Sequence, residues 1–369
     1  MPRSVSRSRW AATVLSAAAL ALAGACQGPP ESSEETGAVD APPSLAVIVA
    51  RDSTVVAVWD GEARPLEGSF ATPGQRVLWS PGGGLMTVNV GGGFWQWAGP
   101  DGPALHHECG PGCQGVYLGD DQLFAYGDGE IRWLPADGSD GTEPVPVEAE
   151  QARGGSVWGA VEGRILVGEE GPQSRTDTED LWLLDPGTGE AAAVGDLPSG
   201  QGQWTQRTAL SAGGGALAVE YEGDGQDGCP VNEGVVVVDT ASLEAGPVVA
   251  PPEASRGGQV LTWDLFFNGG KLYAVFAELY DGCLEDEPMG LWRLDGDSWD
   301  RVSEGGFYAV RPLEGLDGGA AALVVDADFT CKVVALPGGE VRTDLGACGP
   351  EVWSTPTFGE VDLSGLSAR

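Results

Sequence analysis

Tight turns recur along this chain at intervals of 36 to 56 residues, and each follows a short apolar run that often contains tryptophan. The clearest example is Val58-Trp59-Asp60-Gly61. Comparable turns follow at Asp101-Gly102, Asp137-Gly138, Asp185-Pro186-Gly187, Asp239, Asp295-Gly296 and Pro337-Gly338. A period of about 45 residues made only of strands and turns predicts a β-propeller, because each four-stranded repeat can bury its faces only against its neighbours.

Runs of apolar and small residues suited to innermost strands, which are covered on both faces, occur seven times. They are 76–81, 115–119, 156–161, 207–211, 260–267, 307–312 and 351–356. This count predicts an all-β, seven-bladed propeller over 44–358, with six or eight blades as alternatives. The first blade has only three strands of its own, so we expect 351–356 to close the ring by pairing the N- and C-terminal strands.

The turn Trp79-Ser80-Pro81-Gly82-Gly83-Gly84 resembles the Trp-Ser-Pro-Asp-Gly turn of TolB-like and WD40-type propellers, although Gly82 stands where the family has Asp. WD40 blades also carry a structural histidine per repeat, and this chain has only His106 and His107. The chain is therefore more similar to TolB-like propellers. This resemblance implies an architecture and no particular activity.

Residues 1–26 have the pattern of an export signal, with a basic start followed by the apolar run 11–23, which is too short to span a bilayer. The segment Leu22-Ala23-Gly24-Ala25-Cys26 resembles a bacterial lipobox. It implies that Cys26 is lipidated and holds the protein on the outer face of the cell membrane. Plain secretion, after cleavage at the same bond, is the alternative.

Residues 27–43 are rich in Pro, Ser, Glu and Gly, and we expect them to form a disordered tether. Residues 359–369 are expected to be a C-terminal tail. The net charge of −36 makes nucleic acid and anionic lipid surfaces unfavourable partners.

Seven cysteines leave an even six if Cys26 carries lipid, and an exported protein rarely keeps an exposed cysteine unpaired. Their places in the repeats predict three disulfides. The predicted pairs are Cys109 with Cys113, Cys331 with Cys348, and Cys229 with Cys283. The last pair would join corresponding insertions of neighbouring blades.

Candidate catalytic and cofactor-binding motifs are either absent or lie among residues that do not fit those functions. The run 223–228 matches a dinucleotide-binding fingerprint, yet Cys229-Pro230 follows it where a helix would be needed. No Gly-x-Ser-x-Gly elbow is present. The adjacent His106 and His107 would point to opposite faces of a strand and could not grip one metal together. The tryptophans of the third strands are expected to pack between sheets, and these are Trp59, Trp95, Trp97, Trp133, Trp182 and Trp292.

Acidic insertions between the second and third strands of three consecutive blades are the least ordinary feature, and Glu222 and Glu278 are among their acidic residues. Loops that join equivalent strands emerge on one face, so we expect them to form a partner-binding face. Its candidate residues are Glu169, Asp177, Asp224, Asp227, Asp281 and Glu285. Asp224, Asp227 and Asp281 could in addition hold calcium, although their spacing matches no known calcium loop. No other cofactor is expected.

These observations favour a surface-tethered, non-catalytic propeller that binds an envelope protein or a glycan. One alternative is an envelope enzyme that acts on polysaccharide through carboxylates in the central channel, since glycoside cleavage needs two such groups. Another is a structural or assembly factor similar to TolB.

Overall fold

The computed structural model of this chain describes residues 45–49, 55–59, 62–65, 77–80, 85–90, 93–97, 105–110, 112–119, 122–135, 141–168, 181–194, 204–225, 229–280, 285–316, 319–326, 328–347, 353–354 and 360–366. All of these residues belong to one compact unit. The described part consists of strands and turns, with two short 3₁₀ helices, η1 (Gln151–Gly154) and η3 (Ala212–Gly214). Within it, no helix is long and apolar enough to cross a membrane.

The strands form antiparallel sheets of four, numbered here as sheets 1 to 7 in chain order. Sheet 1 contains β28 (Trp353–Ser354), β1 (Leu45–Val49), β2 (Val55–Trp59) and β3 (Glu62–Pro65). Sheet 2 contains β4 (Val77–Trp79), β5 (Met86–Val90), β6 (Gly93–Trp97) and β7 (Leu105–Glu108). Sheet 3 contains β8 (Gln114–Gly119), β9 (Gln122–Gly127), β10 (Glu130–Leu134) and β11 (Val145–Pro146).

The second half of the chain repeats this arrangement with longer strands. Sheet 4 contains β12 (Ser156–Val161), β13 (Arg164–Gly168), β14 (Leu181–Leu184) and β15 (Ala191–Ala193). Sheet 5 contains β16 (Trp204–Leu210), β17 (Ala216–Asp224), β18 (Pro230–Asp239) and β19 (Glu244–Ala245). Sheet 6 contains β20 (Gln259–Asn268), β21 (Lys271–Tyr280), β22 (Glu285–Asp295) and β23 (Ser298–Ser303). Sheet 7 contains β24 (Phe307–Leu316), β25 (Gly319–Asp326), β26 (Thr330–Ala335) and β27 (Val341–Ala347).

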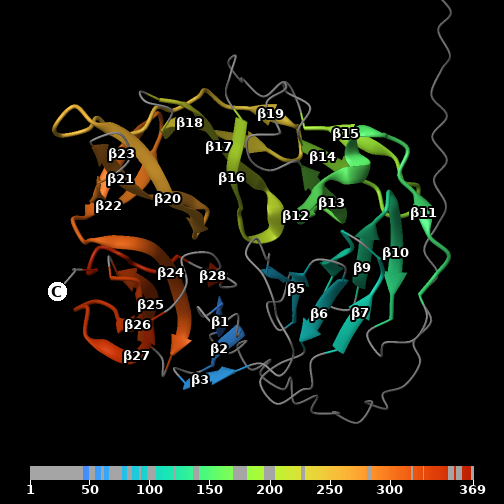
Figure 1. Cartoon of the computed structure of the whole chain (residues 1–369), viewed down its shortest axis with the longest axis horizontal. Coiled ribbons are helices and arrows are strands. Elements are labelled where there is room, and N and C mark those ends of the chain that lie inside the picture. Colours follow the sequence, from blue (N-terminus) through green and yellow to red (C-terminus); the bar gives the residue numbers. More distant parts are fainter. Residues whose placement is uncertain are drawn as a thin grey trace, which may run out of the picture. The chain divides into compact units, whose positions relative to one another are not determined.

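The first strands of successive sheets lie against one another. Strand β4 contacts β8, β8 contacts β12, β16 contacts β20, and β20 contacts β24. Figure 1 shows the sheets following one another around a common centre, with the first strands innermost. This is the arrangement of a β-propeller, as the repeat pattern predicted.

The predicted fold class, a seven-bladed propeller closed by pairing of the N- and C-terminal strands, needs correction to a six-bladed propeller. Only six of the sheets are complete blades built from four consecutive strands. Sheet 1 is a composite, and the strand predicted over 351–356 is reduced to the two residues of β28. Its ladder with β1 consists of Val47 opposite Ser354 and Ile48 opposite Trp353.

The cores lie between neighbouring sheets, where apolar side chains of two sheets interdigitate. One core joins sheets 6 and 7 and includes Phe266, Val275 and Val310. Val361, Leu363 and Leu366, from the segment predicted to be a tail, are buried in the same core. The side chain of Asn268 bonds both backbone groups of Val361, at 2.7 and 2.9 Å, so this segment is fixed against sheet 6.

Two of the predicted acidic insertions are in large part strand. In sheet 5, β17 extends to Asp224 and β18 begins at Pro230. In sheet 6, β21 extends to Tyr280 and β22 begins at Glu285. Acidic residues that were expected in solvated loops are therefore paired across long hairpins, and two of them, Glu222 and Glu278, are buried.

Candidate functional site

Three aromatic side chains, Trp263, Tyr308 and Phe329, form a stack across sheets 6 and 7, called here the aromatic stack. The ring centroids of Trp263 and Tyr308 are 3.8 Å apart, and those of Tyr308 and Phe329 are 4.3 Å apart. All three side chains are partly exposed. Partly exposed stacked rings offer a large, rigid contact area to a partner.

Irregularities in the innermost strands place two of these rings. The register of β20 against β21 shifts between Thr262 and Asp264, which leaves Trp263 as the extra residue. The register of β24 against β25 shifts between Phe307 and Ala309, which leaves Tyr308 as the extra residue. Bulges re-aim single side chains in this way and occur often beside functional sites.

The stack lies toward the face where second and third strands are joined. Tyr308 Oη donates to Asp286 Oδ2 at 3.4 Å, and Asp286 is the second residue of β22. Burial raises the pKa of Tyr308, and the charge and hydrogen bond of Asp286 raise it further. Arg256, which precedes β20, pairs at 2.7 Å with Glu287 of the same hairpin and lies over the ring of Tyr280.

A buried polar cluster lies beneath this face and joins sheets 5, 6 and 7. We call it the junction network, and its members are Arg207, Glu220, Glu222, Asn232, Thr262, Asp264 and Arg311. Arg207 Nη1 donates to Glu220 Oε2 and to Glu222 Oε1, both at 3.2 Å. The Glu220 and Glu222 side chains are 0% and 4% exposed and the Arg207 side chain is 31% exposed, so the two carboxylates are covered while the arginine is partly open to solvent.

The network ties the three sheets together, from the second and third strands of sheet 5 to the innermost strands of sheets 6 and 7. Asn232 Nδ2 donates to Glu220 Oε1 at 3.0 Å and to Thr262 Oγ1 at 2.6 Å, which joins sheet 5 to sheet 6. Asp264 accepts from the Val310 backbone N–H at 3.1 Å and pairs with Arg311, which joins sheet 6 to sheet 7.

Burial sets the protonation of this cluster. Burial and the charge of Glu220 together raise the pKa of Glu222 to about 7, although Arg207 opposes both effects. The pKa of Glu220 is also raised by burial, although Arg207 and hydrogen bonds from Thr262 and Asn232 oppose that shift. Because the pKa of an ordinary glutamate is 4.5, Glu222 is the group placed to change charge near neutral pH.

Glu278, which was grouped with the exposed acidic insertions, instead organises the segment before β20. Its carboxylate accepts from the backbone N–H groups of Ser255, Arg256 and Gly258, at 3.0, 2.9 and 3.0 Å. The Ser255 hydroxyl also donates to it at 2.8 Å. Burial alone would raise the pKa of Glu278, but Tyr280 and these donors outweigh burial and lower the pKa to about 2.

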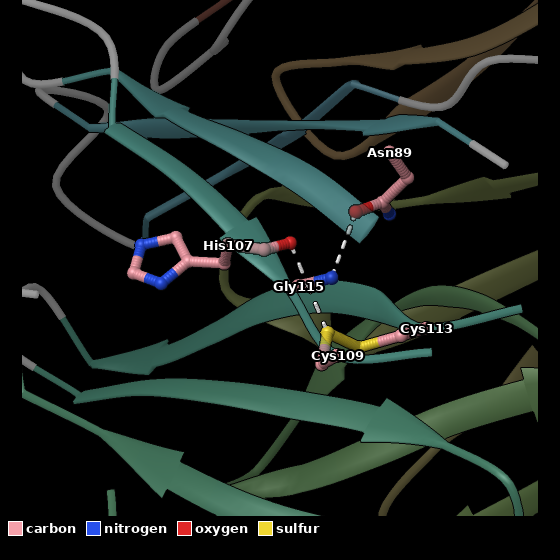
Figure 2. Close-up of a disulfide and its surroundings, with 5 residues drawn as sticks. All are labelled: Asn89, His107, Cys109, Cys113 and Gly115. Carbon is pink, nitrogen blue, oxygen red and sulfur yellow. Dashed lines mark hydrogen bonds between the residues drawn. A yellow bond between two sulfur atoms is a disulfide. The ribbon is translucent and has the colours of Figure 1, made fainter. Parts of the chain in front are cut away.

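The local disulfide predicted between Cys109 and Cys113 is confirmed, and it closes the turn between sheets 2 and 3. Figure 2 shows Cys109 Sγ beside the His107 carbonyl oxygen, 4.0 Å away, and Asn89 Oδ1 accepting from the Gly115 N–H at 2.7 Å. Cys229 and Cys331 are disulfide-bonded as well. Their predicted partners, Cys283 and Cys348, lie outside the described residues.

The two histidines lie on opposite faces of β7, as predicted, because His107 stacks on Phe94 and His106 on Trp95. Both line a pocket of about 280 Å³ between sheets 2 and 3, together with Glu108, Glu130 and Arg132. Among the described residues, no three His, Cys, Asp or Glu side chains are placed to hold a metal ion.

The residues first assigned to a partner-binding or calcium-binding face cannot be compared with the structure. Glu169, Asp177, Asp227 and Asp281 lie outside the described residues, and for Asp224 and Glu285 only the backbone strand is described. Cys26 also lies outside the described part of the chain. The predicted face and the predicted lipidation therefore stay predictions.

Sequence reasoning missed the aromatic stack and the junction network. Arg207, Asp264 and Arg311 each lie within or next to an apolar innermost strand, where a charged residue needs a partner to be buried. A charged residue in an otherwise apolar strand was therefore the sequence feature that could have revealed the junction network. The stack depends on bulges, and no short sequence motif marks Trp263 or Tyr308 as an extra residue.

No protein-family model and no curated protein matches the sequence. Among solved structures, the chain is similar to the dihydro-heme d1 dehydrogenase NirN in complex with DHE, with a TM-score of 0.50, 14% identity, and coverage of 86% of this chain and 76% of that one. It is also similar to an ancestral GH74 enzyme, with a TM-score of 0.50 and 10% identity, over 82% of this chain and 45% of that one.

A TolB protein from Agrobacterium tumefaciens is a further match, with a TM-score of 0.38, 15% identity, and coverage of 84% of this chain and 91% of that one. At such low identity these likenesses concern the fold alone. The chain has the all-β propeller architecture that its resemblance to TolB-like proteins implied.

Proposed function

We propose that this chain is an exported, non-catalytic β-propeller that binds an envelope protein or a glycan through the face bearing the aromatic stack. The observation that supports this proposal is the stack itself: three partly exposed rings, spaced by 3.8 and 4.3 Å, beside the exposed carboxylate of Asp286. Aromatic side chains are enriched where proteins bind partners, because they bury a large area at small entropic cost. The acidic segments near this face would form its polar rim.

The arrangement of the nearby carboxylates supports binding over polysaccharide cleavage. A glycoside hydrolase needs two carboxyl groups that reach the substrate. Glu220 and Glu222 are the paired carboxylates of this region, and both are covered and bonded to Arg207. Their contacts are those of groups that join sheets.

Crosslinking in the intact envelope tests this proposal. We expect the wild-type chain to capture a defined partner, and Trp263→Ala and Tyr308→Ala to reduce capture at least tenfold. Trp133→Ala is the matched control, because Trp133 is 37% exposed and lies on sheet 3. Unchanged capture by both stack variants, with melting temperatures close to the wild type, would remove the stack from the proposal.

The anchoring that we propose rests on sequence alone. The basic start, the short apolar run and the small residues before Cys26 support lipidation at that cysteine. Cys26→Ser should then move the protein from the membrane fraction to the soluble fraction. Retention of this variant in the membrane fraction would contradict lipid anchoring.

A further inference from the structure

The aromatic stack and the junction network share the same stretches of backbone. Trp263 lies between Thr262 and Asp264, and both of these neighbours belong to the network. Tyr308 lies two residues before Val310, whose N–H bonds Asp264. A change in the network would therefore act directly on the two bulges that place the rings.

The network contains three carboxylates and two guanidinium groups among the described residues. The charged groups that act on Glu222 are Arg207 on β16 and Glu220 on its own strand. Around them, Asn232 on β18 bonds Glu220, and Asp264 on β20 acts on Arg207 and pairs with Arg311 on β24. One carboxylate is thus in excess, and all three carboxylates are buried. A buried charge without a partner is costly, so the site favours one added proton.

Hydrogen bonding identifies the carboxylate that takes this proton. Glu220 accepts from Arg207 and Asn232, and Asp264 accepts from Arg311 and from the N–H groups of Leu265 and Val310. Among the described residues, Glu222 accepts one hydrogen bond, from Arg207. Glu222 therefore has the fewest donors that stabilise its charged form, which favours it as the carboxylate that holds the added proton.

We propose that Glu222 is a proton-operated switch that sets how firmly Trp263 and Tyr308 are held at the binding face. When Glu222 is neutral, Arg207 pairs with Glu220 alone, and Glu220 holds Asn232 and Thr262 in place. When Glu222 is ionised, it shares Arg207 and repels Glu220, which loosens the tie to the Trp263 bulge. The consequence for partner capture rests on the proposed function, whereas the coupling itself does not.

Tryptophan fluorescence between pH 5.5 and 8.5 tests the coupling without any partner. The signal of Trp263 is the difference between the wild type and Trp263→Phe at each pH. We expect it to change sigmoidally with a midpoint near pH 7, and to be more quenched and blue-shifted on the acidic side. Glu222→Gln should give the acidic-side signal at every pH, because glutamine resembles the neutral carboxyl group.

Glu287→Gln is the matched control, since Glu287 lies in the neighbouring hairpin but is exposed, and it should keep the wild-type transition. A flat Trp263 signal in the wild type would overturn the proposal. So would an unchanged transition in Glu222→Gln, which would point to another group such as His107. If the coupling holds but the stack variants still capture the partner, the proposed function fails and the switch stands.

Discussion

Polar side chains connect neighbouring sheets in two regions of the propeller, and the two regions use different chemistry. Between sheets 2 and 3, neutral groups make the ties: Thr87 Oγ1 donates to the Gly115 carbonyl at 2.8 Å, and Asn89 accepts from the Gly115 N–H at 2.7 Å. Between sheets 5 and 6, Asn232 bonds Thr262 and is itself held by the carboxylate of Glu220, and between sheets 6 and 7 the charged pair of Asp264 and Arg311 makes the tie. Neutral ties keep the same hydrogen bonds at every physiological pH, whereas the charged network depends on its proton count.

The difference shows what each region is suited for. A neutral tie costs little to bury once its donors and acceptors are matched, so it serves to align two sheets. A buried ion network is a poor source of net stability, because desolvation offsets most of its attraction. Its presence beside the aromatic stack is more easily understood as control of that face than as reinforcement of the ring.

Removing the shared cation should have the largest effect. Arg207→Met leaves Glu220 and Glu222 buried without a counter-charge, and we expect it to lower the free energy of unfolding by about 3–5 kcal/mol. Urea denaturation at pH 7.5 measures this loss. If Arg207→Met lowers the free energy of unfolding no more than Asn89→Ala does, breaking the junction network costs no more than breaking a neutral hydrogen bond between sheets.

The neutral ties should break at a smaller cost. Asn89→Ala leaves the Gly115 N–H without its acceptor, and we expect a loss of about 1–3 kcal/mol that is the same at pH 6 and pH 8. Urea denaturation at both pH values tests this. A clear difference between the losses measured at pH 6 and at pH 8 would contradict the expectation that the neutral hydrogen bonds between sheets 2 and 3 do not depend on pH.

Glu278 sharpens the comparison, because it is a buried carboxylate that accepts hydrogen bonds from several donors. Its pKa is lowered to about 2 from 4.5, so its stabilising effect is fully present above pH 4.5 and is lost as the pH falls toward 2. Glu278→Gln should cost about 1–2 kcal/mol at pH 7 and almost nothing at pH 2. Glu287→Gln should cost less than about 1 kcal/mol, since its pair with Arg256 is exposed. Equal losses for Glu278→Gln at both pH values would refute the assigned role.

The sequence was sufficient to predict what depends on local pattern. The repeat of turns predicted four-stranded sheets, and the spacing of Cys109 and Cys113 predicted their disulfide. The seven-blade count and the closure by the terminal strands were wrong, because the apolar run 351–356 was counted as the inner strand of a further blade, whereas only the two residues of β28 are described there. Acidic residues such as Glu278 were misplaced because charge alone does not reveal a matching set of backbone donors. The contacts of Arg207 with Glu222 and of Asp264 with Arg311 depend on how strands pair and sheets pack, which residue patterns do not specify.

The smallest expected effect is a gain. The pKa of Glu222 is raised to about 7 in the folded chain, against 4.5 as its ordinary value, so the folded state binds more protons than the unfolded state between these two values. The stabilising effect of this proton is fully present below pH 4.5 and is lost as the pH rises through 7. Glu222→Gln removes the titrating group and keeps a neutral side chain of the same shape. We therefore expect it to stabilise the protein by about 1 kcal/mol at pH 8 and to leave stability at pH 5 almost unchanged, as measured by urea denaturation at the two pH values. A variant that is less stable than the wild type at pH 8 would mean that the ionised Glu222 strengthens the junction, and the contrast between the two regions would then lose its basis.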